Sequence, residues 1–166
     1  MTRTRRATVA MLLVGLAIFS SLYSTQAILP TLVRNMGLSS TEAAMTVSAA
    51  TGALALCVGP ASLLSERFGR GRILLISAVA ATGVGLIVPL AQEGWQLIVV
   101  RGLQGALLSG APATAMAWLS EELDDKALPR AMGLYIAGTS VGGLTGRLIP
   151  TGLVEISTWR WALFGS

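Results

Sequence analysis

The sequence predicts an all-α protein, a polytopic bundle of transmembrane helices with about five complete spans and the start of a sixth. Of its 166 residues, 53% are hydrophobic and 12% are charged, about half the roughly 25% of soluble domains. The mean hydropathy is +0.70. Apolar runs recur at the length of about 20 residues that crosses about 30 Å of hydrocarbon as a helix. None of these runs alternates with a period of two, so transmembrane β-strands are not expected.

The composition also excludes several classes of function. The chain has no His and one Cys, which rules out a His-dependent catalytic triad, a His-ligated metal and an internal disulfide. We therefore expect no metal and no cofactor. A nucleic-acid partner would need far more charge than the formal net charge of +4 supplies. The basic excess instead favours contact with the anionic headgroups of a lipid bilayer.

The apolar runs follow one another along the chain, and each is typical of one membrane helix. They cover residues 7–32, 41–65, 72–91, 95–119 and 131–153. A secretory signal peptide is the alternative for the first run, but that run is too long and four more follow it. A sixth run begins at Trp159, so we expect residues 1–166 to be the N-terminal part of a longer membrane protein, truncated in its sixth helix.

The loop cations predict the orientation. With the N-terminus inside, eight Lys and Arg lie in cytoplasmic segments, namely Arg3, Arg5, Arg6, Arg67, Arg70, Arg72, Lys126 and Arg130. Only Arg34 and Arg160 then lie outside. Because cytoplasmic loops carry the excess of Lys and Arg, we expect a multi-pass membrane protein with a cytoplasmic N-terminus.

Two cations, Arg101 and Arg147, lie within predicted spans. A charge at membrane depth costs at least about 2.5–3.5 kcal/mol on insertion scales, so it normally faces a cavity or a partner. The residues on the same helix face as Arg101 are small or polar: Gly105, Ser109 and Pro112. With Gln104 beside it, this face is predicted to line a substrate or proton pathway. Snorkelling to the outer interface is the alternative for Arg101 and, more strongly, for the secondary candidate Arg147.

The first span carries a comparable polar stripe. Phe19, Tyr23, Gln26 and Pro30 recur at helical spacing. The Tyr23 hydroxyl and the Gln26 amide need hydrogen-bond partners, and we interpret them as substrate contacts. The alternative is that Tyr23 belongs to an aromatic belt at the membrane surface.

The fifth span carries glycines at helix-packing spacing. Gly138, Gly142 and Gly146 are four residues apart, and Gly143 is adjacent. Small residues at this spacing let the backbone of another helix approach closely. We expect a packing seam here, which could also be a surface that slides.

The turn between the second and third spans, SLLSERFGRGR, resembles the signature of the major facilitator superfamily, G-x-L-a-D-R-x-G-R-[RK]. Ser62 stands at the first Gly of that signature, and Glu66 stands at the Asp. The resemblance implies that Glu66, Arg67, Gly69 and Arg70 form a latch between two halves of the protein. Glu66 and Arg70 could also pair across one helical turn.

Other segments resemble the same family in the same order. RGLQG at 101–105 is similar to its R-x-x-q-G motif, in which the Arg faces the central cavity and is linked to proton coupling. GTSVGG at 138–143 resembles the G-P-x-x-G-G of drug:proton antiporters, with Thr139 in place of Pro. YSTQAILP and GLYIAGTSVGGLTGR are similar to segments of bacterial inner-membrane efflux permeases.

The resemblance implies twelve helices in two six-helix halves, with the substrate bound between them. Residues 1–166 would form the N-terminal half, and the missing C-terminal half of the same chain would be its partner. The implied activity is secondary-active, proton-coupled export of a small-molecule substrate by alternating access, and not an enzymatic reaction.

The lack of acidic residues inside the spans leaves an alternative function open. No Asp or Glu lies deep in a span, since Glu42, Glu93 and Glu155 are at ends or loops. A titrating acid would have to come from the absent half. Two membrane cations without acids favour, as the alternative, an importer or exchanger of organic anions. A non-transporting membrane receptor or assembly protein is the more distant alternative.

Overall fold

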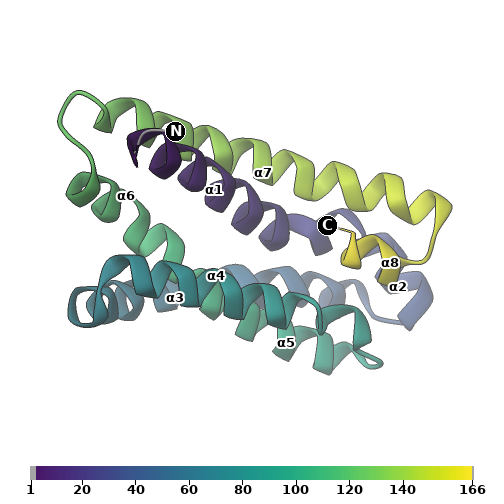
Figure 1. Ribbon diagram of the computed structural model, residues 1–166. Coiled ribbons are helices and arrows are strands. Elements are labelled where there is room, and N and C mark those ends of the chain that lie inside the picture. Colours follow the sequence, from purple (N-terminus) through teal and green to yellow (C-terminus); the bar gives the residue numbers. More distant parts are fainter. Residues whose placement is uncertain (1–2, 166) are drawn as a thin grey trace.

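The computed structural model describes residues 3–165, which fold into helices joined by short turns, without a strand in that range (Figure 1). The prediction of an all-α protein is confirmed. In chain order the elements are α1 (Arg3–Ala27), α2 (Leu29–Met36), α3 (Ser40–Phe68), α4 (Arg70–Gly85), the 3₁₀ turn η1 (Val88–Leu90), α5 (Gly94–Leu108), α6 (Gly110–Glu122), α7 (Leu128–Ile156) and α8 (Trp159–Phe164).

The helices form two layers. α1 lies along α7 in one layer, α3, α4 and α5 form the other, and α6 leads from the second layer back to the first (Figure 1). The N-terminus, the α3–α4 turn and the α6–α7 loop lie at one end of the bundle, and the α2–α3 and α7–α8 connections lie at the other (Figure 1). The chain therefore crosses the bundle alternately, as spanning segments must.

The first predicted span is divided into α1 and α2. Pro30 lies in the first turn of α2 and has no N–H to donate to the carbonyl of Gln26. The helix consequently ends at Ala27, and a short turn follows in which the N–H of Ile28 bonds the carbonyl of Thr25 at 3.2 Å.

The fourth predicted span is also divided, at Ser109. Pro112 cannot donate to the carbonyl of Leu108, so α5 ends there and α6 begins at Gly110. The hydroxyl of Ser77, on α4, donates to the neighbouring carbonyl, that of Leu107. A neighbouring helix thus contacts the backbone at the break.

Two of the five predicted spans are not single helices that are both long and apolar enough to cross a membrane. Among the described residues, three helices are: Thr4–Ala27, Ser40–Phe68 and Arg70–Leu90. The run at 95–119 is too short on either side of its break, and α7, although 29 residues long, is diluted by glycines, hydroxyls and Arg147. The prediction of about five complete spans is therefore not confirmed as a count.

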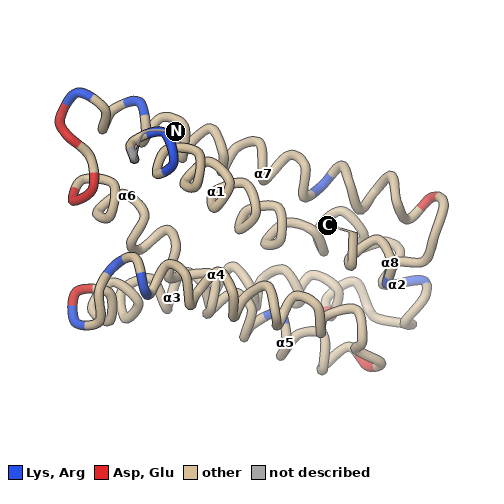
Figure 2. The backbone as a smooth tube through the Cα atoms, viewed as in Figure 1, with Lys and Arg blue, Asp and Glu red and all other residues tan. Residues whose placement is uncertain are grey.

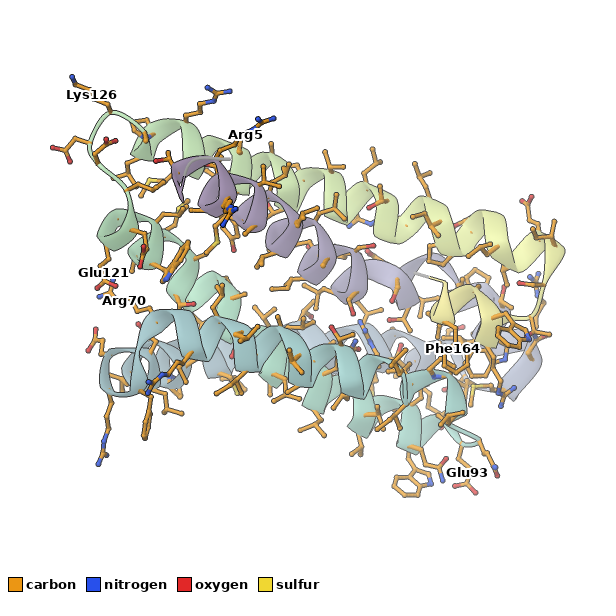
Figure 3. The ribbon with its side chains drawn as sticks, in the orientation of Figure 1. Arg5, Arg70, Glu93, Glu121, Lys126 and Phe164 are labelled. Carbon is orange, nitrogen blue, oxygen red and sulfur yellow. The ribbon has the colours of Figure 1, made fainter. Side chains whose placement is uncertain are left out.

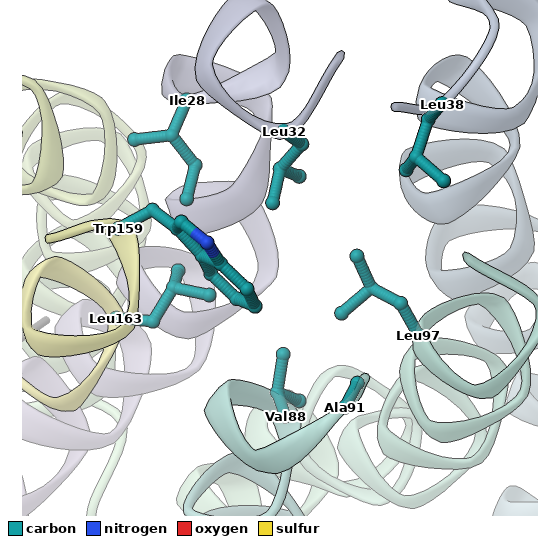
Figure 4. Packing of buried hydrophobic residues seen from close by; sticks show 8 residues of the cluster. All are labelled: Ile28, Leu32, Leu38, Val88, Ala91, Leu97, Trp159 and Leu163. Atoms are coloured by element: carbon teal, nitrogen blue, oxygen red, sulfur yellow. The ribbon is translucent and has the colours of Figure 1, made fainter. Parts of the chain in front are cut away.

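A hydrophobic cluster closes the end of the bundle opposite the N-terminus. Its eight buried residues are Ile28, Leu32, Leu38, Val88, Ala91, Leu97, Trp159 and Leu163 (Figure 4). They come from α2, α5, α8 and the connections around them, so distant segments meet here. The cluster holds α8 against α2 and η1.

Lys, Arg, Asp and Glu residues gather at the two ends of the bundle, and the helices between are largely uncharged (Figure 2). Arg5, Arg70, Glu121 and Lys126 lie at the end that holds the N-terminus, and Glu93 lies at the other (Figure 3). This is the distribution that a bilayer around the bundle requires.

A labelling experiment tests the predicted orientation. In the full-length protein without its native cysteines, including Cys57, single cysteines at the exposed positions Thr4 and Arg72 should resist a membrane-impermeant thiol reagent in intact cells. A cysteine at the exposed Asn35, at the other end, should react. All three should react after permeabilisation, which controls for accessibility. Labelling of position 72 in intact cells would contradict a cytoplasmic N-terminus.

Candidate functional site

Arg101 lies in the middle of α5 and is buried inside the bundle, with 1% of its surface exposed. Its Nη1 donates to the carbonyl of Ser21 at 3.1 Å and to Oε1 of Gln104 at 2.6 Å, and its Nη2 donates to the carbonyl of Leu22. The Gln104 Nε2 donates in turn to the Ser21 hydroxyl at 2.8 Å. Together the two side chains tie α5 to α1.

The charge of Arg101 has no counter-ion among residues 3–165. Its hydrogen-bond partners are neutral carbonyl and amide oxygens, and its Nε has no partner in the described part of the chain. Removing a charge from water without a counter-ion costs several kcal/mol, even after the protein relaxes. An arginine in this position therefore stabilises the fold poorly, which favours a functional role.

A cavity of about 230 Å³ lies beside this cluster, between α1, α4, α5 and α8. Arg101 and Gln104 form part of its wall with the hydroxyl-bearing Ser21, Ser24 and Thr82. Its volume has room for several waters, each of which occupies about 30 Å³ in the liquid. Gly105, predicted on the same lining face, packs elsewhere: a Cβ there would overlap the backbone of Ala50 on α3.

Tyr23, Gln26 and Arg147 form a second polar cluster, where α1 meets α7. The Arg147 guanidinium carbon lies 4.3 Å from the centre of the Tyr23 ring, and its Nε donates to Oε1 of Gln26 at 3.0 Å. Arg147 and Gln26 are exposed, and Tyr23 is half-buried. The structure thus brings the predicted stripe of the first span to Arg147 and leaves Arg101 in a separate cluster.

Glycines bring α1 and α7 into contact along their length. A Cβ at Gly138, Gly142 or Gly146 would overlap the carbonyl oxygens of Leu12, Leu16 and Ser20, respectively. Gly15 of α1 contributes from the other side, since a Cβ there would lie 2.8 Å from the Tyr135 carbonyl. Gly143 differs from the other three. A Cβ there would lie 3.4 Å from the Tyr23 ring, which is an ordinary contact distance.

The predicted latch residues surround the turn between α3 and α4. Gly69 has φ of 96°, a conformation that favours glycine, and it ends α3. Arg70 Nε lies 3.3 Å from Glu121 Oε1 at the end of α6, so the described ion pair joins two helix ends and is not the expected pair with Glu66 (Figure 3). Glu66 and Arg67 are exposed. A contact of this turn with another half of the protein stays a prediction.

Sequence reasoning missed three contributors to these sites. Ser21 supplies both a carbonyl and a hydroxyl to the buried cluster, Gly15 completes the α1–α7 seam, and Ser77 contacts the backbone at the break in the fourth span. Gly15 carried a usable signal, because a small residue in the first span can match the glycines of the fifth. The role of Ser21 depends on a partner 80 positions away, which no local pattern reveals.

An arginine that is buried without a carboxylate partner in a largely apolar helical bundle is typical of membrane proteins that keep an ionisable group inside the membrane for a function such as transport. The sequence comparison supports this class and names the family. Residues 11–166 match the Major Facilitator Superfamily. The chain belongs to this superfamily of transporters, which are not enzymes.

Named relatives agree with this assignment. The chain is 35% identical over 158 residues to the inner membrane transport protein YnfM of Escherichia coli (strain K12), covering 95% of this chain and 38% of the relative. It is 35% identical over 159 residues to the MFS-type transporter YybF of Bacillus subtilis (strain 168), covering 96% and 39%. A transporter of Buchnera aphidicola subsp. Acyrthosiphon pisum is 36% identical over 149 residues, covering 90% and 36%. The chain thus spans well under half the length of these relatives.

Proposed function

We propose that this chain is the N-terminal part of a secondary-active transporter that exports small molecules by alternating access, with protons as the coupling ion. The family and the relatives named as transporters support transport. They also disfavour a receptor or assembly protein. The observation that carries the proposal is the buried guanidinium of Arg101, which touches a polar cavity and has no counter-ion among the described residues.

Arg101 would act on a proton carrier supplied by the rest of the protein. Glu42, Glu93 and Glu155 lie near helix ends, and all three are exposed. A carboxylate that approached Arg101 in one conformation would be held ionised by the positive charge and would release its proton there. In the other conformation it would regain the proton. This exchange would couple proton movement to the change of access.

The proposal also places the protein in the bacterial inner membrane with its N-terminus in the cytoplasm. The E. coli relative is named an inner membrane protein, and the cations Arg5, Arg70 and Lys126 share the end that holds the N-terminus (Figure 3). The missing partner would be a second half of the same protein, docked against this bundle.

Reconstitution of the full-length protein tests the coupling. Vesicles that enclose a pH-sensitive dye and carry an imposed pH gradient should lose that gradient faster when a transported compound is added. A protonophore provides the upper limit, and protein-free vesicles provide the background. Saturable flux of a compound that does not change with the pH gradient would overturn proton coupling and leave transport intact.

Import or exchange of organic anions is the second candidate function. The observation that favours it is the exposed guanidinium of Arg147 on the α1–α7 surface, within the fifth predicted span.

A further inference from the structure

Arg147 is held in a fixed orientation by two residues of α1. Its guanidinium stacks over the Tyr23 ring at 4.3 Å, and its Nε donates to Oε1 of Gln26 at 3.0 Å. The Tyr23 ring also lies against Gly143, one turn earlier on α7. An arginine fixed by its ring stack and its Nε presents the opposite edge of the guanidinium, which bears Nη1 and Nη2.

The position of Arg147 argues against snorkelling. It precedes the end of α7 at Ile156 by nine residues, which is about 14 Å of helix at about 1.5 Å per residue. Its side chain is folded across to α1, where Tyr23 and Gln26 hold it. A snorkelling arginine would extend along its own helix toward the membrane surface.

Arg147 shares one exposed face of α7 with Ser140, Leu144 and Thr151, at successive spacings of four, three and four residues. Ionisable side chains within membrane helices almost always face protein or a water-filled cavity. We therefore expect this face of α7 to meet the rest of the protein or a water-filled pathway at Arg147.

The free edge of the Arg147 guanidinium is suited to bind a carboxylate. Within residues 3–165 no carboxylate pairs with Arg147, and the hydrogen bond that it donates comes from Nε alone. The two Nη groups of a guanidinium form a planar fork that matches the two oxygens of a carboxylate. Arg101 differs in this respect, because its Nη1 and Nη2 are used by α1 carbonyls and Gln104 inside the bundle.

Resting on the transport function proposed above, we propose that Arg147 binds the carboxylate of an anionic small-molecule substrate, with Tyr23 and Gln26 as its positioning residues. The substrate would enter the space between the α1–α7 surface and the rest of the protein. Its carboxylate would accept two hydrogen bonds from Nη1 and Nη2, and its apolar part would lie against Tyr23 and Phe19, whose ring centres are 6.3 Å apart.

The test pairs acids with their neutral amides, on the full-length protein in detergent and in vesicles. The probes are benzoate with benzamide, phenylacetate with phenylacetamide, and hexanoate with hexanamide. At least one acid should raise the melting temperature saturably and enter vesicles saturably, and its amide should do neither. Arg147→Gln should weaken binding of that acid at least about tenfold, since hydrogen bonds to a charged group are lost. Arg147→Lys should recover only part of it, because an ammonium lacks the fork.

Arg34→Gln is the matched control, because Arg34 is an exposed cation at the end of α2 and away from this cluster. It should bind the acid as the wild type does. Any of three results would overturn the anion site. The acid and its amide could bind equally, none of the acids could bind the wild type, or Arg147→Gln could bind the acid as tightly as the wild type does. If the Arg147→Gln protein then still transported a neutral or cationic dye saturably, the transport function would be retained without the anion site. Absence of saturable flux for acids, amides and dyes alike in the wild type contradicts the transport function itself.

Discussion

Replacing Arg101 with alanine is expected to abolish gradient-driven flux in the full-length protein. The change removes the guanidinium charge from the buried cluster and leaves Gln104 and the carbonyls of Ser21 and Leu22 without its donors. A carboxylate in the other half would then lack the positive charge that favours release of its proton. Flux of a transported compound into vesicles, with and without an imposed pH gradient, measures the effect.

The melting temperature separates this loss from unfolding. Burying Arg101 without a counter-ion costs free energy, which offsets part of the loss of its three hydrogen bonds, so Arg101→Ala should lower the melting temperature only modestly. Its binding of a transported compound without a gradient should persist, since the Arg101 terminal nitrogens are engaged inside the bundle. Arg72→Ala, which removes an exposed cation at a helix end, should keep wild-type flux.

The conservative change Arg101→Lys distinguishes charge from geometry. A lysine keeps the positive charge but cannot make the three hydrogen bonds of the planar fork. Partial flux in Arg101→Lys would mean that the positive charge is sufficient for some coupling. Complete loss of flux would mean that the hydrogen bonds between α1 and α5 are needed as well. Full flux in Arg101→Ala would show that Arg101 has no part in coupling.

Replacing Gly142 with leucine is expected to abolish transport as well, through a different cause. A side chain there would overlap the backbone of α1 at Leu16, so α1 and α7 must separate. Inserting bulk into a packed contact costs about 1–3 kcal/mol and shifts the backbone. Because the same two helices carry Tyr23, Gln26 and Arg147, the separation would also pull that cluster apart. Flux should fall more than the amount of protein in the membrane does.

Gly133→Leu is the matched control on the same helix. A Cβ at Gly133 meets nothing within 4 Å, so the side chain projects into open space. This variant should retain both its abundance and its flux. Normal flux in Gly142→Leu would contradict the close approach of α1 and α7 as a requirement for transport.

Local patterns predicted much of the fold. Runs of about 20 apolar residues require helices in a membrane, because backbone groups in lipid must be satisfied within the segment. The four-residue spacing of Gly138, Gly142 and Gly146 predicts a face that another backbone approaches, and a Cβ at each of them would overlap a carbonyl oxygen of α1. The prediction of one continuous helix over residues 95–119 was wrong at Ser109. The run is continuously apolar, but the chain divides there into α5 and α6 near Pro112. Hydropathy registers composition, whereas a break depends on the local packing as well as on a missing N–H, since Pro60 and Pro150 lie inside the unbroken helices α3 and α7.

The sequence by itself therefore determined that this protein is a helical membrane bundle, and which residues share a helix face. Only the tertiary structure decided what each face meets. It turned Arg101 into the bundle, onto α1 carbonyls 79 and 80 residues away, and it brought Arg147 to Gln26 across 121 residues. The physical reason is that helical periodicity is a property of one segment. The partner of a face is chosen by close packing between segments, through contacts such as the glycine seam of α7 on α1.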